Sequence, residues 1–307
     1  MLTGFILLFS LIAIFANVIL ILAFIIQWKL SYSSQHFTYF VLNMSMSGLL
    51  YAATNLWVSV PCTLDMCPFI STDHLMVALA TPNSLAHWVY LLSAMSFTIY
   101  RFCLFMSKSF SDRTTCIKAL VIAPWALTSL LIFGTTGLGC YKRYNRLSLS
   151  YTYNCSNCNI FLGISFIDVN FYAGQAIPLA MITAYVIILA SVYRSRRRNV
   201  GFHRRQSRVD TKLAFQFTVI CFSQYLAALL FFVVPKFSGG GVIGVLLMNS
   251  IGTINVSVNP IVLLLFNHQI RSSVRMICDC SKAQSVVQDL TPTQWTTAPR
   301  QISWVSK

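Results

Sequence analysis

Three polar side chains recur at helical spacing in one long apolar stretch of the chain. Arg101 ends this stretch, and Asn83 and His87 stand 18 and 14 residues before it. Because an α-helix makes a turn about every 3.6 residues, these intervals are close to whole numbers of turns, and the three side chains fall near one face. Amide and imidazole groups on such a face can recognise a ligand by hydrogen bonds. His87 could equally bond a neighbouring helix.

Acidic residues are absent from every long apolar stretch. All seven lie in predicted loops or in the tail, at Asp65, Asp73, Asp112, Asp168, Asp210, Asp279 and Asp289. Ion-coupled transporters keep such groups at mid-membrane, and intramembrane proteases need Asp pairs or His and Glu clusters there. The sequence therefore predicts a protein that is not an enzyme and that holds no metal ion or other cofactor.

The elements that must position these side chains are seven stretches of at least 23 residues without Asp, Glu, Lys or Arg. A bilayer core about 30 Å thick needs roughly 20 apolar residues per helix. Only 9% of the residues are charged and 56% are apolar, which is typical of a membrane protein. We therefore predict an all-α polytopic membrane protein, a seven-transmembrane helix bundle. Its spans are predicted at 4–27, 37–60, 76–100, 119–141, 169–193, 213–235 and 242–266.

The basic residues indicate how the bundle is oriented. Of the 22 Lys and Arg residues, 18 fall in the connections after spans 1, 3 and 5 and in the tail. By the positive-inside rule these segments are cytoplasmic, so the N-terminus is outside and the C-terminus inside. The net charge of +15 thus follows membrane topology, and we expect no nucleic acid partner. Residues 1–280 form one transmembrane domain, and 281–307 are predicted to be a disordered cytoplasmic tail.

Five cysteines lie at or beyond the outer ends of the spans, in an oxidising compartment: Cys62, Cys67, Cys140, Cys155 and Cys158. An outer disulfide is expected, with its connectivity open. A bridge from Cys62 or Cys67 to one of the other three would join the long outer loop to the bundle. The pair at Cys155 and Cys158 has zinc-like spacing but no second ligand pair nearby. Asn154 begins a glycosylation sequon on the same side.

The end of span 7 carries a proline joint. Pro260 removes a backbone hydrogen bond, which Asn259 or Ser257 could partly replace. An amphipathic juxtamembrane helix is predicted at 267–278, with its apolar side chains at helical spacing. Cys278 and Cys280 follow and could be palmitoylated or remain ordinary thiols.

Together these features resemble the rhodopsin-like G-protein-coupled receptor superfamily, and most closely the nematode serpentine chemoreceptors of class X. The resemblance extends from residue 4 to about residue 280. The matching positions, each in the expected span and order, are Asn17, Asn43, Arg101, Trp125, Pro178 and Asn259 with Pro260.

The chain departs from the superfamily pattern at several positions. Tyr100 stands where most members have an acid beside the arginine, so the usual salt bridge of Arg101 is absent. Gly48 replaces the aspartate that holds sodium in many members, and Leu263 replaces the tyrosine after the Asn-Pro pair. Met76 occupies the usual cysteine site of span 3. The chain therefore lacks some of the residues whose contacts usually change when receptors of this superfamily are activated.

The resemblance implies a chemosensory receptor of the plasma membrane, including that of a sensory cilium, which binds an external small molecule. It implies a heterotrimeric G protein at the inner mouth, contacted by Tyr100, Arg101 and Phe102. A transporter or ligand-gated channel is the alternative. The implied pocket lies between the outer halves of spans 3, 5, 6 and 7. Asn83 stands where many amine receptors have an aspartate, which argues against a cationic amine as ligand.

Four residues near the outer ends of spans 3 and 5 complete the predicted ligand site: Trp88, Asp168, Asn170 and Tyr172. They could provide a partly polar site with aromatic walls. Trp88 and Tyr172 could instead belong to an interfacial aromatic belt, and Asp168 could cap the start of its helix.

Overall fold

The computed structural model describes residues 2–30, 35–64, 67, 73–106, 113–145, 150–155, 159–161, 164–198, 204–238 and 242–278. The structural statements below concern these residues. Cys158, Cys280 and the predicted tail 281–307 lie outside them, and so do the side chains of Asn154, Cys155 and Cys278.

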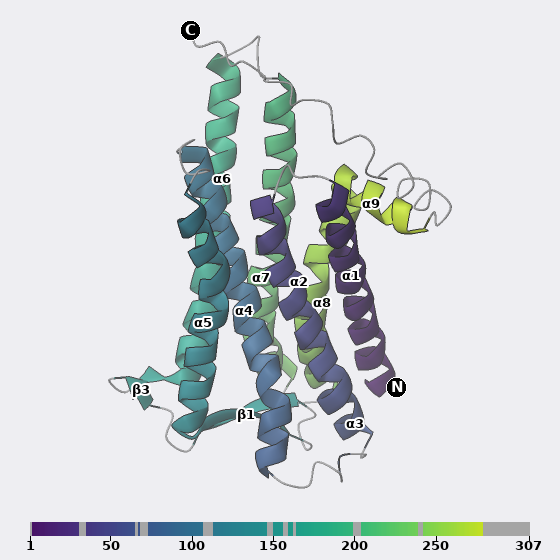
Figure 1. Ribbon diagram of the computed structural model, residues 1–307. Helices are drawn as coiled ribbons and strands as arrows, with labels where there is room; N and C mark the ends of the chain where they lie inside the picture. The colour runs from purple at the N-terminus through teal and green to yellow at the C-terminus, as the bar shows by residue number, and fades with distance from the viewer. Residues whose placement is uncertain are drawn as a thin grey trace.

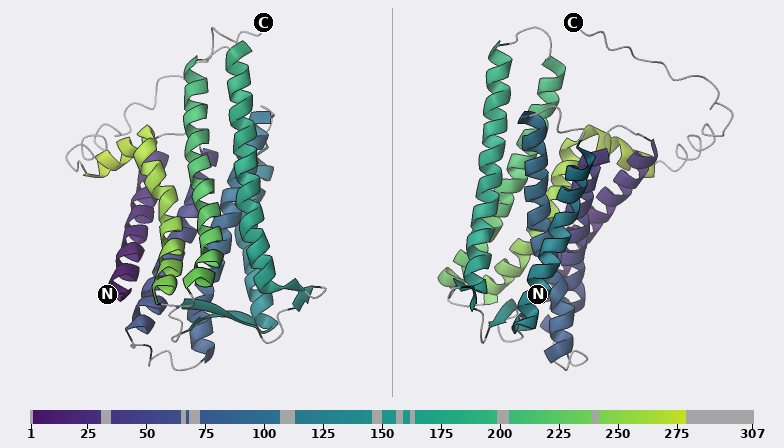
Figure 2. Two further views of the ribbon diagram at one scale, coloured as in Figure 1. Left: turned by 180° about the vertical axis from the view of Figure 1, so that it is seen from behind. Right: turned by 60° about the vertical axis from the view of Figure 1, so that its left-hand side comes forward.

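The described chain is mostly helical, and its long helices run side by side between two ends of a bundle (Figures 1 and 2). The N-terminus lies at the end that carries the β-strands, whereas α9 lies at the opposite end. The helices are α1 (Leu2–Leu30), α2 (Gln35–Thr54), α3 (Val60–Thr63), α4 (Asp73–Met106), α5 (Thr114–Gly137), α6 (Phe166–Arg198), α7 (Arg204–Ser238), α8 (Val242–Phe266) and α9 (His268–Cys278).

Five of the described helices are long and apolar enough to cross a bilayer. The qualifying segments are Thr3–Ile26, His74–Met106, Thr114–Gly137, Phe166–Ser191 and Asn249–Phe266. In α7 the described apolar segment, Phe215–Phe231, is shorter. The α2 helix is more polar, but its Ser45 and Ser47 are fully buried against neighbouring helices. The chain is a multi-pass membrane protein, with five apolar helices of membrane length among the residues that the structure describes.

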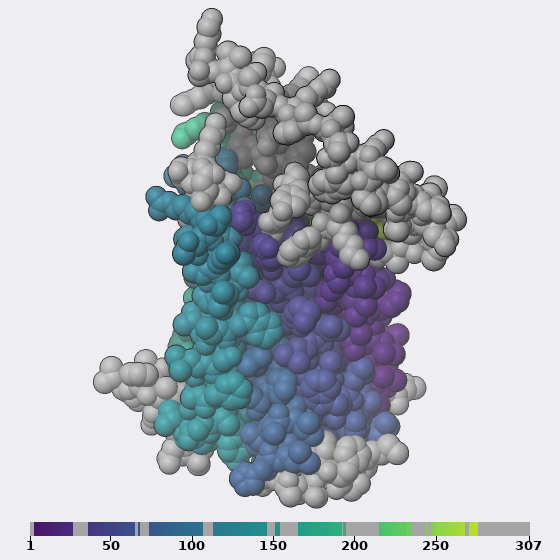
Figure 3. Space-filling model, viewed as in Figure 1, coloured from purple at the N-terminus to yellow at the C-terminus, as the bar shows by residue number. Residues whose placement is uncertain are grey.

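Large apolar side chains cover the outside of the bundle. Phe15 is 68% exposed, and Leu130 and Phe133 on α5 are 75% and 62% exposed. The face in Figure 3 is formed by α1, α2, α4 and α5. In water such a surface would be an aggregation hazard, whereas in a bilayer it is the surface that contacts lipid.

The helix that begins with α2 contains a π-helical turn. The π-helix η1 (Asn55–Ser59) follows α2 directly and continues into α3. A π-turn carries an extra residue and so changes the direction of the side chains after it. Asn55, at its first position, is 4% exposed and points into the bundle. Hydropathy does not reveal this feature, and the sequence did not predict it.

Two helices extend well past the predicted spans. The spans 169–193 and 213–235 were bounded by charge, but α6 continues to Arg198 and α7 begins at Arg204. Both helices project beyond the others at the α9 end (Figure 1). Hydropathy marks where a helix can contact lipid, whereas Arg, Lys and Gln are good helix formers that continue the helix into water.

A β-hairpin occupies the long outer connection, where an all-α fold with loops was expected. Strand β1 (Cys140–Asn145) pairs with β2 (Ser150–Cys155) in antiparallel register. A second pair, β3 (Asn159–Phe161) and β4 (Ile164–Ser165), precedes α6. In β2, Tyr151 and Tyr153 alternate with the polar residues Ser150, Thr152 and Asn154, a pattern that favours strands.

One disulfide of the structure is local. Cys62 is bonded to Cys67, so neither can bridge to the long outer loop as the sequence suggested. Cys140 is also disulfide-bonded, and Cys155 faces it across the hairpin register. Met76, at the site of the family's usual cysteine, packs in the same cluster as Cys62 and Cys67. Chain connectivity alone could not predict this pairing, because it depends on how the connection folds back.

Candidate functional site

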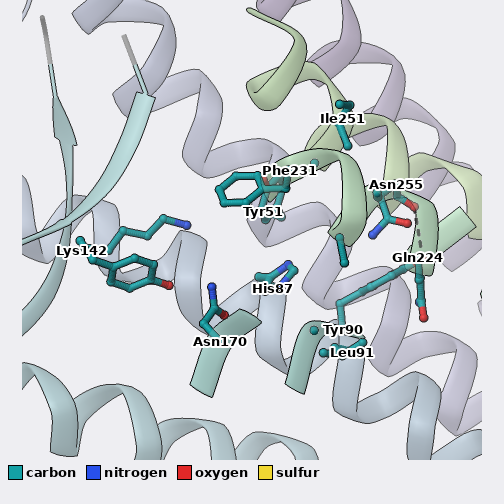
Figure 4. Close-up of a pocket in the computed structure, with 15 residues that line it drawn as sticks. Tyr51, His87, Tyr90, Leu91, Lys142, Asn170, Gln224, Phe231, Ile251 and Asn255 are labelled. Carbon is teal, nitrogen blue, oxygen red and sulfur yellow. Dashed lines mark hydrogen bonds between the residues drawn. The ribbon is translucent and has the colours of Figure 1, made fainter. Parts of the chain in front are cut away.

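A cavity of about 70 Å³ opens between the helices at the hairpin end of the bundle (Figure 4). A water molecule needs roughly 10–15 Å³ by this measure, so the space accommodates several waters or a small molecule. Its lining comes from α2 (Tyr51), α4 (His87, Tyr90, Leu91), β1 and β2 (Lys142, Tyr153), α6 (Asn170, Gly174), α7 (Gln224, Ala227, Ala228, Phe231) and α8 (Ile251, Gly252, Asn255).

The hairpin directs Lys142 toward this cavity. Successive side chains of a strand point to opposite faces, and Lys142 shares a face with Tyr144 on β1. In the register, Lys142 lies opposite Tyr153, and Tyr144 lies opposite Tyr151. Tyr144 and Tyr151 are buried, so this face packs on the bundle. Figure 4 shows the Lys142 side chain extending from its strand into the site.

Lys142 is held by an amide and two aromatic rings. Its Nζ donates a hydrogen bond to Asn83 Oδ1 at 2.7 Å. The same atom lies 5.1 Å from the ring centre of Tyr151 and 5.7 Å from that of Tyr153, within the range of a cation–π contact. Burial lowers the pKa of Lys142 to about 7, because desolvation disfavours the charged amine. The side chain is thus poised between its charged and neutral forms near neutral pH.

A chain of amides connects Lys142 to the far side of the bundle. Asn83 Nδ2 donates to Asn55 Oδ1 at 3.5 Å. Asn55 Nδ2 in turn donates to Thr253 Oγ1 on α8 at 2.9 Å. Asn83 is fully buried and Thr253 is 1% exposed. The hairpin, α4, η1 and α8 therefore share one buried polar network, and the π-turn places Asn55 in it.

The opposite wall of the cavity carries polar groups that have no partner among the described residues. Gln224 on α7 is 3% exposed and lies beside the Tyr90 hydroxyl, but neither of its amide atoms makes a hydrogen bond of good geometry among the described residues. Asn255 on α8 is 8% exposed, and its Oδ1 is also unpaired. Tyr90 donates instead to the Asn255 backbone carbonyl at 3.4 Å. Buried polar groups are normally satisfied, so Gln224 and Asn255 are the groups best placed to bind a ligand or water.

Two backbone features keep this wall open. A Cβ at Gly252 would overlap the Tyr51 hydroxyl, so glycine lets Tyr51 reach the cavity. Pro178 has no N–H to donate to the carbonyl of Gly174, four residues earlier in α6. Gly174 lines the cavity, which places the proline-disrupted turn of α6 beside it.

The residues predicted to bind a ligand lie in different surroundings. His87 and Asn170 line the cavity, and Asn83 lies one hydrogen bond behind it. Trp88 is buried elsewhere, with its Nε1 unpaired among the described residues. Tyr172 is 67% exposed on the outside of α6.

Asp168 is hydrogen-bonded to Ser165 at the start of α6. The Ser165 hydroxyl donates to Asp168 Oδ2 at 2.6 Å, and the Asp168 N–H donates to Ser165 Oγ at 3.1 Å. The Ser165 hydroxyl thus caps one free backbone N–H at the helix start, and the Asp168 carboxylate holds that hydroxyl in place. Asp168 therefore has a structural role outside the cavity, as the alternative interpretation of the sequence allowed.

The most informative lining residues were missed. Lys142 was not singled out from the sequence, whereas its place in a strand, where successive side chains point to opposite faces, directs it toward the cavity. Tyr51, Tyr90 and Gln224 were passed over because polar residues in long apolar stretches are common and their faces depend on packing. The alternation in β1 and β2 was the one signal that could have identified Lys142 and Tyr153.

At the other end of the bundle, Arg101 borders an aromatic cluster. Its guanidinium lies 5.9 Å above the ring of Phe97. Phe97 contacts Phe217 of α7 with ring centres 4.5 Å apart, and Tyr185 of α6 stacks on Phe217 at 6.0 Å. Tyr100 stacks on Phe40 of α2 at 5.1 Å, and Phe102 is partly buried. These contacts join α2, α4, α6 and α7 around Arg101.

The proline joint of α8 is supported by another helix. Pro260 cannot donate to the carbonyl of Val256, and Asn17 of α1 donates its Nδ2 to that carbonyl at 3.4 Å. Ser257 bonds Thr253 instead, and both Asn259 amide atoms are buried without a partner among the described residues. The expectation that Asn259 or Ser257 replaces the lost bond is therefore wrong, because a neighbouring helix supplies the donor.

Other predicted packing positions lie in helix interfaces. Asn43 of α2 donates to the Val121 carbonyl of α5 at 2.6 Å, on the helix that carries the partly buried Trp125. Gly48 leaves room for the Asn17 amide, which a Cβ would approach to 3.1 Å. In α9, Ile270 is buried while Arg271 and Arg275 are exposed. Asn43 and Gly48 thus contribute to the packing of α2 against α5 and α1.

Comparison with known proteins identifies a family whose model matches part of the chain. Residues 148–280 match the family described as "Serpentine type 7TM GPCR chemoreceptor Srv". The chain is similar to the serpentine chemoreceptors. The matched class is Srv, whereas the sequence resembled class X most closely. The matched region runs from the start of the hairpin's second strand through α9, and so includes Gln224 and Asn255 but not Lys142 or Arg101. No curated protein matches the chain.

The likeness to serpentine chemoreceptors indicates to which functional class of protein the chain is similar. That family consists of receptors and not of enzymes, and it supports a receptor of the GPCR type. Membrane-length helices and a disulfide at the hairpin end agree with this class.

Proposed function

We propose that this chain is a chemosensory receptor of the plasma membrane that binds an external small molecule in the cavity and activates a heterotrimeric G protein. The observation that carries the proposal is the buried Gln224, which faces a cavity between α4, α6, α7 and α8. Its amide makes no hydrogen bond of good geometry among the described residues. Such unsatisfied groups are costly and are expected where a ligand completes them. The likeness to serpentine chemoreceptors supports the receptor class.

The proposed topology has seven crossings, made by α1, by α2 with η1 and α3, and by α4 to α8. The hairpin end, with its disulfides, is external, and α9 rests at the inner surface. Basic residues near the ends of α6 and α7 lie at the same end as α9, in accord with the positive-inside rule. Exposed Arg271 and Arg275 on α9 would contact anionic lipid there.

The proposed mechanism is a population shift between two arrangements of α7. A ligand that bonds Gln224 on α7 and Asn255 on α8 favours the arrangement in which both groups are satisfied. The same α7 helix carries Phe217, which packs on Phe97 at the other end of the bundle. Moving α7 outward separates these rings and uncovers Arg101. Signal transfer therefore needs no chemical step by the chain.

The inner surface thus exposed would bind the G protein through Tyr100, Arg101 and Phe102. Arg101 contacts the ring of Phe97, and Tyr100 stands where most superfamily members have an acid. A cation–π contact is weaker than a buried salt bridge, at about 0.5–2 kcal/mol. The inactive state should therefore be less tightly closed than in receptors with the acid.

The test is calcium or cAMP imaging in cells that express the chain with promiscuous G proteins, challenged with a panel of volatile and water-soluble compounds. We expect at least one compound to evoke a response that Arg101→Ala abolishes and that Arg113→Ala preserves. Arg113 is a matched control, because it is an exposed arginine at the start of α5. An evoked ion current that persists in Arg101→Ala would overturn the proposal in favour of a ligand-gated channel.

A further inference from the structure

The amino group of Lys142 has no acidic neighbour in the described part of the chain. The groups that face it are Asn83 and His87 from α4, Tyr51 from α2, and Tyr151 and Tyr153 from β2. None of these is a carboxylate. The protonated form of Lys142 is a buried positive charge without a negative partner. An anion that enters the cavity would pair with this charge and stabilise it.

The hydrogen-bonding capacity of Lys142 indicates what such an anion can be. An ammonium group has three donors, and the structure assigns one of them to Asn83 Oδ1. Two donors are left for the oxygens of a carboxylate, and charge-assisted bonds of this kind are roughly twice as strong as neutral ones. The rings of Tyr51, Tyr153 and Phe231 restrict water around this end of the cavity.

The remainder of the cavity limits the size of the ligand and indicates a second hydrogen-bonding group on it. A volume of about 70 Å³, at roughly 10–15 Å³ per water-sized group, holds about five to seven non-hydrogen atoms. Leu91, Ala228 and Ile251 offer apolar contacts between the two polar ends. Gln224 and Asn255 provide an unpaired donor and acceptors at the far end, and Figure 4 shows them across the site from Lys142.

We propose that the cavity binds a small organic carboxylate that carries a second hydrogen-bonding group, such as a hydroxyl or carbonyl. Its carboxylate pairs with Lys142, and the second group bonds Gln224. This inference rests on the proposed function for the location of the ligand site, and it adds the chemical class. It also agrees with the absence of an acidic residue from the described cavity lining, which leaves a cationic ligand without a counter-ion.

The test is direct binding to the full-length protein in lipid nanodiscs, measured by calorimetry without any G protein. The probes are short hydroxy and keto acids of about five to seven non-hydrogen atoms, with their methyl esters and amides. We expect an acid to bind at least about tenfold more tightly than its own ester, since one tenfold step is about the strength of a single good polar contact. Equal binding of acid and ester would overturn the proposal.

Two variants locate the effect. Lys142→Met preserves side-chain length without charge, and it should weaken binding of the acid at least about tenfold while leaving the ester unchanged. Arg143→Met is the matched control on the other face of β1, and it should leave both unchanged. Retained binding of the ester shows that a variant is folded. An acid whose affinity does not change in Lys142→Met contradicts the assignment.

Three further measurements test whether the bound anion is organic, whether its affinity depends on the charge of Lys142, and whether the receptor function stands without this inference. Chloride and bicarbonate are titrated alone, and binding by either with the affinity of the organic acid would overturn an organic ligand. Affinity for the acid should also fall about tenfold per pH unit above pH 7, with no such fall in Lys142→Met, which retains His87 and the tyrosines. Signalling evoked by a neutral compound, with no acid bound, would refute this inference and leave the receptor function intact.

Discussion

Replacing Gln224 by leucine should stabilise the unliganded protein and impair ligand binding at the same time. Gln224 is 3% exposed, and beyond its approach to the Tyr90 hydroxyl neither of its amide atoms has a hydrogen bond of good geometry among the described residues. Leucine has a similar size and no polar atoms, so the desolvation cost of the amide disappears. An unsatisfied buried polar group costs about 1–3 kcal/mol, and we expect a stabilisation of this order in Gln224→Leu.

The assay is thermal unfolding of purified protein in nanodiscs, with and without ligand. For chains of 150–250 residues, 1 kcal/mol shifts Tm by about 2–4 °C, so Gln224→Leu should raise the Tm of the unliganded protein by several degrees. The ligand-induced rise in Tm should shrink or vanish. A gain in stability that comes with a loss of function is the usual sign of a site kept unsatisfied for binding.

Gln175→Leu is the matched control. Gln175 is also a glutamine on a long helix, its amide atoms are likewise buried without described partners, and it does not line the cavity. It should raise Tm in the same way and leave the ligand-induced shift unchanged. If Gln224→Leu lowers Tm while Gln175→Leu raises it, then Gln224 has a partner in the unliganded protein, and our reasoning about the cavity wall is refuted.

Three further changes test other parts of the structure. Phe217→Ala removes the ring that contacts Phe97 at 4.5 Å and should raise basal signalling in cells several-fold; unchanged basal activity at equal surface expression would contradict the proposed role of this contact. Asn17→Ala removes the donor to the Val256 carbonyl and should lower stability by about 1 kcal/mol, seen as a lower Tm, whereas an unchanged Tm would show that the bond does not support the proline joint. Between about pH 7 and pH 10.5 the unfolded chain still binds the proton that Lys142 has lost in the folded protein, so stability of the unliganded protein should rise with pH over this interval. Denaturation across this pH range should show a smaller rise in Lys142→Met, and an identical rise would count against a lowered pKa of Lys142.

The helices of the bundle were predictable because a bilayer imposes its thickness on the sequence. Charge-free stretches located the long helices, and the spacing of Asn83 and His87 from Arg101 placed them on a common face. The ends of α6 and α7 were not predictable in this way, because a helix rich in arginine continues in water. The π-turn at Asn55 was also hidden, since one extra residue in a helix leaves hydropathy unchanged.

The ligand cavity was only partly predictable because it depends on contacts between distant segments. Lys142 reaches Asn83, 59 positions away in the chain, through a hairpin that the loop composition only weakly suggests. Asn17 reaches the Val256 carbonyl across 239 positions. The cysteine pairing likewise depends on how the connection after α3 folds. Residue type indicates what a side chain can do, but only packing decides which groups meet.

The central claim is that the cavity and the inner surface around Arg101 are separate sites coupled through α7. It is tested most directly by measuring ligand binding and G-protein nucleotide exchange on the same reconstituted protein, with a ligand taken from the cell assay. We predict that Gln224→Leu loses binding and exchange together, while Arg101→Ala retains binding and loses exchange. Ligand binding that survives in Gln224→Leu, or that is lost in Arg101→Ala, would contradict the account.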